Sequence, residues 1–151
     1  RSDVYRLLAD DEFISSSKAT LQSIIEAPYD GVWQPAAFTY VSQLVIRRAK
    51  EHKFEQFDVR AVSEMKNLKI LVLSGGFTGM VNVDQLPTNC KTLVINCPGQ
   101  PQESRLMFPD WPSDKHLDWL SLSAHTTQID MTKLRGKVKQ MNLHTAWLLL
   151  D

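Results

Sequence analysis

The side chains best suited to acid–base catalysis are dispersed along this sequence. Its histidines stand at four separate positions, His52, His116, His125 and His144. Each is more often a surface or turn residue than a catalytic base. No Ser-His-Asp order, phosphate-binding loop or HExxH motif occurs, although these patterns mark common classes of enzyme. The sequence therefore predicts a protein that has no catalytic residues and is not an enzyme.

Two further stretches have residues found in active sites, but simpler explanations fit them. Asp110, Asp114 and Asp118 lie four residues apart, yet Pro109 and Pro112 prevent one helix from holding the three carboxylates on one face. The glycine-rich stretch 74–79 follows a predicted strand, but no helix follows whose N-terminus would bind a phosphate. We expect it to be the turn that leaves the strand.

The two cysteines, Cys90 and Cys97, argue against both a disulfide and a metal centre. They lie seven residues apart on one predicted strand, so Cys90 faces the core while Cys97 faces the opposite side or the turn, and they should not pair. Free thiols favour a reducing, intracellular compartment, cytoplasmic or organellar. Metal ligands would need closer clustering, so we expect no metal and no cofactor.

Residues suited to binding a protein are better represented. Certain apolar and basic residues recur at regular spacing and should form an apolar centre with a basic rim. The apolar residues are Ile70, Val72, Val94 and Trp119, and the basic residues are Lys69, Lys91, Arg47 and Lys139. An apolar centre with a charged rim is typical of protein interfaces, where Trp is a favoured anchor. The alternative is that strands favour β-branched residues and that the chain covers this face itself. For any single lysine, a solvated edge without a ligand is the simpler interpretation.

These residues alternate in the sequence with apolar triplets. The triplets mark the strands that should position the binding residues. Five triplets share one spacing and occupy fifteen apolar positions: Val41, Leu44 and Ile46; Leu68, Leu71 and Leu73; Cys90, Leu93 and Ile95; Leu117, Leu120 and Leu122; Val138, Met141 and Leu143. The middle positions are separated by 27, 22, 27 and 21 residues, within or near the period of about 20–29 residues of leucine-rich repeats. Alternate strand residues point to opposite faces, so the triplets enter a core and the residues between them face outward.

The segments between the triplets also align with one another. VNVDQLP before Cys90 matches IDMTKLR before Val138, and FDVRAV matches LMFPDW. Their apolar residues, such as Val81, Val83 and Leu86, should face inward from the convex side. Prolines interrupt these segments, so short extended pieces or single helical turns are expected there instead of long helices.

The motif Phe77-Thr78-Gly79, Val81-Asn82-Val83, Leu86-Pro87, Cys90, Leu93 and Ile95 resembles the F-S/T-G-x-L/I-D-L-x-x-L-P type of leucine-rich repeat common in kinetoplastid proteins. The resemblance covers roughly residues 41–143 and is clean in one repeat. It implies an α/β leucine-rich-repeat solenoid with about five parallel strands on the concave face. The asparagine that usually bonds the turn backbone is replaced at the ninth position by Ala49, Gly76, Pro98, His125 and Ala146. The turns must therefore be satisfied in another way.

The predicted domain is single, with residues 1–40 forming an N-terminal helical cap and lead-in, and 41–151 the repeats. Two short amphipathic runs before Pro28 would cover the open end of the solenoid, because a terminal repeat needs a cap. Strands are predicted near 41–47, 68–74, 90–96, 117–123 and 138–144. Past the last strand stands the apolar run Trp147, Leu148, Leu149 and Leu150, which folds back, continues into more repeats or self-associates.

The charge of the chain is balanced, with 17 basic and 17 acidic residues among 151, so no uniform field favours nucleic acid or a membrane surface. No apolar run is long enough to span a membrane, and the start at Arg1 is compatible with a removed segment. The sequence predicts a protein-binding scaffold that uses its concave face. The alternatives are an assembly element that self-associates through its C-terminal end, and weak nucleic-acid binding through the basic rim.

Overall fold

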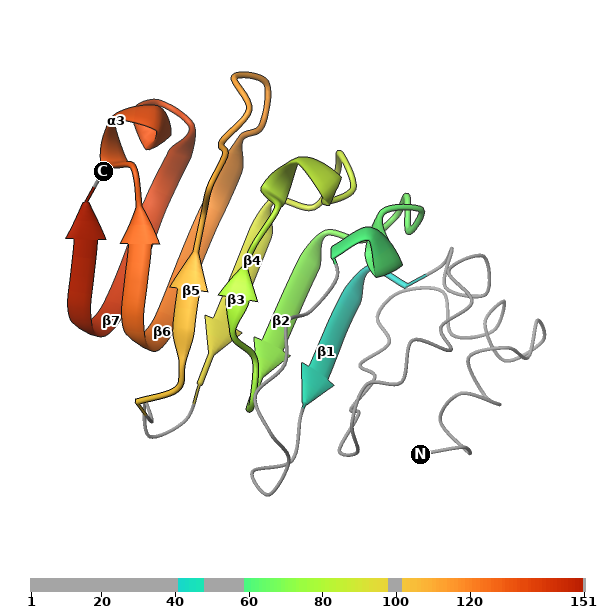
Figure 1. The fold of residues 1–151 in the computed structure, drawn as a ribbon. Helices are drawn as coiled ribbons and strands as arrows, with labels where there is room; N and C mark the ends of the chain where they lie inside the picture. Colours follow the sequence, from blue (N-terminus) through green and yellow to red (C-terminus); the bar gives the residue numbers. More distant parts are fainter. Residues whose placement is uncertain (1–40, 48–58, 98–101, 151) are drawn as a thin grey trace.

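The fold is a curled, entirely parallel β-sheet with few helices (Figure 1). The computed structural model describes residues 41–47, 59–97 and 102–150 of the chain. Seven strands form the sheet, in the order β1-β2-β4-β6-β5-β3, with β7 paired to β6. The helical elements in the described ranges are single turns: η2 (Val59–Val62), η3 (Val83–Gln85) and α3 (Met131–Leu134).

Five strands lie side by side in chain order and carry the apolar triplets. They are β1 (Gln43–Arg47), β2 (Ile70–Ser74), β4 (Thr92–Asn96), β6 (Leu117–Ile129) and β7 (Val138–Leu150). Their register aligns the middle triplet positions in one row, Leu44, Leu71, Leu93, Leu120 and Met141. Residues at equivalent triplet positions are therefore register partners in neighbouring strands. Each inward side chain contacts its equivalent on the next strand.

The sheet curls because β6 bends and pairs with different strands along its two halves. Its first half pairs with β4, and its second half pairs with β5 (Arg105–Met107), which in turn pairs with β3 (Gly79–Met80). Figure 1 shows β3, β5 and the ends of β6 and β7 as a second layer in front of β4 and the first halves of β6 and β7. The second layer is therefore made of the short strands β3 and β5 and the second halves of β6 and β7.

The last two strands are longer than the sequence indicates, and this corrects their predicted ends near residues 123 and 144. Both continue for 13 residues, to Ile129 and Leu150. Two hydrogen bonds to the buried Ser104 hold β6 extended where it bends. The backbone N–H of His125 donates to Ser104 Oγ at 2.7 Å, and that of Thr126 donates to the Ser104 carbonyl at 3.1 Å. The run Trp147–Leu150 consequently belongs to β7 and does not follow it.

The core fills the space between the two layers. The inward leucines and isoleucines of β1, β2, β4 and β6 are at most 2% exposed. Val81, Val83 and Leu86 are also buried and face them from the other layer. The core is less well buried at β7, where Val138, Met141 and Leu143 are only partly buried against it.

Side chains satisfy several backbone carbonyls in the connections that lead into β2, β4 and β6. Lys115 is buried, and its Nζ donates to the Leu86 carbonyl at 2.9 Å. Trp111 Nε1 donates to the Lys115 carbonyl at 3.1 Å, and Asn89 Nδ2 to that of Lys66 at 3.1 Å. Burial lowers the pKa of the Lys115 ammonium. The long lysine side chain thus satisfies a backbone carbonyl 29 residues away in the sequence.

The two cysteines are free and buried. Cys90 faces the core, while Cys97 lies in the turn after β4, where its Sγ–H donates to the Phe77 carbonyl at 3.2 Å. Burial raises the pKa of each thiol to about 11. Both thiols are therefore protonated and poorly reactive at neutral pH.

The predicted N-terminal cap, residues 1–40, lies outside the described residues. Within the described ranges, no helix is long and apolar enough to cross a membrane.

Candidate partner-binding face

The apolar residues predicted to bind a partner lie together on the side of the sheet that faces away from the core. The register places Ile70, Thr92 and Trp119 in one row across β2, β4 and β6. Val72 and Val94 stand side by side in the next row, followed by Ser121. We call the surface of Ile70, Val72, Thr92, Val94 and Trp119 the outward face. Residues from three strands, 49 positions apart at the extremes, form one contiguous surface.

Each member of the outward face is half-buried, as expected for side chains that cover one another on a sheet. At the β7 side the two rows end in polar residues, Gln140 and Asn142, which are both exposed. The Nδ2 of Asn142 donates to Ser121 Oγ at 3.4 Å. Val45 of β1 is aligned with Val72 and is also half-buried, so the apolar part of this side of the sheet runs from β1 to the start of β6 and has a polar border at β7.

A second row of side chains, which includes Lys69, Lys91 and Asp118, borders the outward face. The backbone hydrogen bonds at the starts of the strands explain its position. The Lys69 carbonyl accepts from both Lys91 N–H at 3.1 Å and Thr92 N–H at 3.2 Å, and the Lys91 carbonyl accepts from Asp118 at 2.8 Å and Trp119 at 3.2 Å. One carbonyl that faces two successive N–H groups is the pattern of a β-bulge, which re-aims side chains locally. Consecutive residues therefore both lie on the exposed side.

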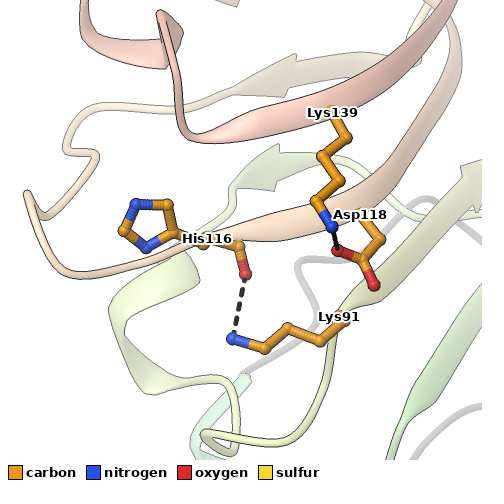
Figure 2. Close-up of polar contacts among 4 residues, drawn as sticks. All are labelled: Lys91, His116, Asp118 and Lys139. Atoms are coloured by element: carbon orange, nitrogen blue, oxygen red, sulfur yellow. Dashed lines mark hydrogen bonds and ion pairs between the residues drawn. The ribbon is translucent and has the colours of Figure 1, made fainter.

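The basic rim is partly engaged in contacts within the chain (Figure 2). Lys139 Nζ lies 3.3 Å from a carboxylate oxygen of Asp118, and Lys91 Nζ donates to the His116 carbonyl at 3.3 Å. Both partners of the ion pair are largely exposed, so the pair contributes little to stability. Lys69 is exposed at the edge of the same column. The fourth predicted rim residue, Arg47, ends β1, and its side chain lies outside the described part of the structure.

The sequence analysis did not include Asp118 among the site residues. Its signal was available, because Asp118 directly follows the first residue of its triplet, as Lys69, Lys91 and Lys139 do in theirs. In the structure Asp118 belongs to the rim, and its carboxylate lies between the positive charges of Lys91 and Lys139. A partner would meet Lys69 and Lys91 on one side of this carboxylate and Lys139 on the other.

A polar pocket adjoins the rim at Lys91. Its volume is about 230 Å³, and it is lined by Asp84, Leu86, Thr88, Lys91, Pro112, Asp114 and Lys115. The ammonium of Lys115 already donates to a backbone carbonyl, so it has a structural role. In the described ranges, no group of three histidine, cysteine or acidic side chains is arranged to hold a metal ion.

The apolar run at the C-terminal end is a second exposed surface, separate from the outward face. Exposure there is 63% for Trp147, 40% for Leu148, 39% for Leu149 and 63% for Leu150. All four residues lie on β7, which is at the edge of the described sheet (Figure 1).

Comparison of the chain with protein-family models, with curated proteins and with solved structures gives no match.

Proposed function

We propose that this chain is a non-enzymatic protein-interaction module, built from leucine-rich repeats, that binds a partner protein through its outward face. The repeat assignment is supported by the five triplets, whose middle residues form one row in the sheet. It is also supported by the alternation of a strand with a short turn or strand on the other layer. On this proposal the outward face is the concave face of a short solenoid.

The observation that carries the binding proposal is the apolar character of a surface that the core does not use. The solvated side of a sheet normally carries polar residues. Here Ile70, Val72, Val94 and Trp119 occupy it side by side, while β7 next to them carries Gln140 and Asn142. Strands favour both β-branched and aromatic residues, so it is the grouping of these side chains on one surface, beside the polar residues of β7, that supports a binding role. Tryptophan is enriched among residues that dominate binding energy.

The rim indicates the chemistry of the partner. Lys69 and Lys91 lie on neighbouring strands beside the apolar rows, and the nearest carboxylate, Asp118, is paired with Lys139. A complementary surface would present an apolar knob with acidic residues beside Lys69 and Lys91. The contacts of Lys91 and Lys139 within the chain reduce the free positive charge. The rim thus favours a protein partner over the phosphate backbone of a nucleic acid, which needs several free cations.

The direct test is affinity capture from a native extract with the wild-type chain beside a Trp119→Ala/Val94→Asp variant. We expect at least one partner whose recovery falls by roughly tenfold in the variant, because truncating a central anchor removes a large share of the binding energy. A milder variant, Val72→Thr/Val94→Thr, keeps β-branching and guards against loss of the fold. Circular dichroism and the unfolding midpoint check that each variant is folded.

The matched control is Met80→Asp/Met131→Ala, which applies the same kinds of change to exposed side chains off the outward face. It should capture the partner as the wild type does. Equal recovery by the wild type and both outward-face variants would refute this binding site. Binding of labelled RNA with a steep dependence on salt would instead support the nucleic-acid alternative.

A further inference from the structure

The polar pocket beside the rim lies between the connections that enter two neighbouring strands. One wall comes from the connection into β4, with Asp84, Leu86 and Thr88, and the other from the connection into β6, with Pro112, Asp114 and Lys115. Lys91, which directly precedes β4, lines the pocket and also belongs to the rim. A partner seated on the outward face would therefore meet this pocket at Lys91.

The positive charges of the pocket lie deeper than its negative charges. Lys115 is 9% exposed and Lys91 is half-buried, whereas Asp84 and Asp114 are both exposed. One of the two carboxylates is also engaged within the chain, because Asp84 Oδ2 accepts from Gln85 Nε2 at 2.9 Å. Water screens exposed charges more strongly than buried ones. The inner part of the pocket is thus positive, although the formal charges of its four ionised side chains cancel.

Lys115 lacks the counter-ion that a buried ammonium group normally has. Its Nζ donates to the uncharged Leu86 carbonyl at 2.9 Å, and among the described residues it forms no ion pair. The pKa of Lys115 is lowered, chiefly by burial and further by the charge of Lys91, although Asp114 and Asp84 act in the opposite direction. The two carboxylates of the pocket therefore do not fully offset the cost of burying this charge.

The ammonium group of Lys91 has a similar environment. Its Nζ donates to the His116 carbonyl at 3.3 Å, which is again an uncharged acceptor (Figure 2). An ammonium group has three N–H donors, so Lys91 and Lys115 each have donors left for another acceptor. A carboxylate accepts several hydrogen bonds at its two oxygens, and such bonds are strengthened by charge on both partners. A phosphate has more negative charge, so Asp84 and Asp114 would repel it more strongly.

We propose that this pocket receives the carboxylate of an acidic side chain of the partner protein, held between the ammonium groups of Lys91 and Lys115. The proposal rests on the proposed function, because the partner would lie on the outward face while its acidic residue enters the pocket. Lys115 then has two roles: it supports the turn at Leu86 and it selects an acidic residue of the partner. The exposed carboxylates of Asp84 and Asp114 favour a singly charged group over a phosphorylated residue.

An NMR titration of the intact chain with a glutamate blocked at both ends, N-acetyl-glutamate N-methylamide, tests the pocket without a partner. We expect saturable shifts of the amides of Leu86, Lys91 and Lys115, with a dissociation constant in the millimolar range because the probe lacks the rest of the interface. The uncharged blocked glutamine and inorganic phosphate should each bind roughly fivefold more weakly or less. Absence of saturable shifts, equal binding of the glutamine or tighter binding of phosphate would overturn the proposal.

Three variants locate the binding of the blocked glutamate. Lys115→Gln removes the buried charge and should weaken binding by roughly tenfold. Asp114→Asn removes an exposed repulsive charge and should strengthen binding by roughly two- to fivefold, an effect that a purely structural Lys115 does not predict. Lys133→Gln, an exposed site on α3, is the matched control and should bind as the wild type does. If Asp114→Asn bound no more tightly than the wild type, the proposal would fail, even where Lys115→Gln does not fold.

Capture of the partner from a native extract separates this proposal from the proposed function. We expect Lys115→Gln and Trp119→Ala/Val94→Asp to lose the same partner, and Lys133→Gln to retain it. Full recovery with Lys115→Gln, together with loss in the outward-face variant, would overturn the pocket and leave the outward face as the binding site. Loss with Lys115→Gln alone would support the pocket and refute the outward face.

Discussion

The hydroxyl of Thr127 offers the sharpest test of the packing described above. Thr127 is fully buried in β6 between Leu106 of β5 and Leu148 of β7. Its Oγ1 has no hydrogen-bond partner in the described part of the chain. Valine has nearly the same shape, keeps β-branching and removes the hydroxyl. Thr127→Val should therefore stabilise the protein, although most substitutions in a core destabilise it.

The expected gain follows from the cost of burying an unsatisfied polar group, about 1–3 kcal/mol. Allowing for partial relaxation, the free energy of unfolding should rise by about 1–2 kcal/mol, with a rise in Tm of roughly 2–8 °C for a domain of this size. Urea denaturation followed by tryptophan fluorescence measures the change, and the slope against urea should not alter. Wild type and variant must be compared at a concentration where their oligomeric states agree.

Thr145→Val is the matched control, because the same substitution there removes a hydroxyl with partners. Thr145 Oγ1 lies 3.0 Å from the His125 carbonyl and 2.9 Å from the Trp147 carbonyl, across the corners of β6 and β7. Its loss should lower the free energy of unfolding by about 1 kcal/mol. A Thr127→Val protein that is less stable than the wild type would refute the reasoning, since it would mean that the hydroxyl is satisfied.

Two further predictions concern the core and the thiols. Leu120→Ala should cost about 2–5 kcal/mol of unfolding free energy, whereas Met141→Ala, aligned with it on the open strand β7, should cost less than half as much; equal losses in urea titrations would contradict the open edge. Cys90 and Cys97 should resist a thiol reagent at neutral pH until denaturant unfolds the chain, because both are buried with pKa raised to about 11. Because the folded thiols hold their protons above the unfolded value of 9.0, the contribution of these two groups to stability should fall between about pH 9 and 11, and less steeply in a Cys90→Ala/Cys97→Ala variant. Rapid labelling of the folded protein would show that the thiols are accessible.

The inward face of the sheet and the composition of the outward face were readable from the residues alone. A strand alternates its side chains strictly, so the spacing of Leu71 and Leu73 identifies one face as apolar and interior. The recurrence of the triplets then aligned equivalent residues of neighbouring strands, which is why Ile70, Val72, Val94 and Trp119 could be grouped from the sequence. The short elements of the other layer followed from the prolines.

Tertiary structure alone decided how the sheet curls and where it ends. The bend in β6 depends on Ser104, which is distant in sequence from His125 and whose hydroxyl has no recognisable pattern. Likewise, Lys115 supports a turn 29 residues away, so local motifs could not identify it. The engagement of the rim by Asp118 depends on which strands are neighbours. Alternation within a strand is a local steric property that the sequence carries directly. Corners, long-range carbonyl bonds and an uncovered edge depend on which distant segments meet, and only the folded chain determines that.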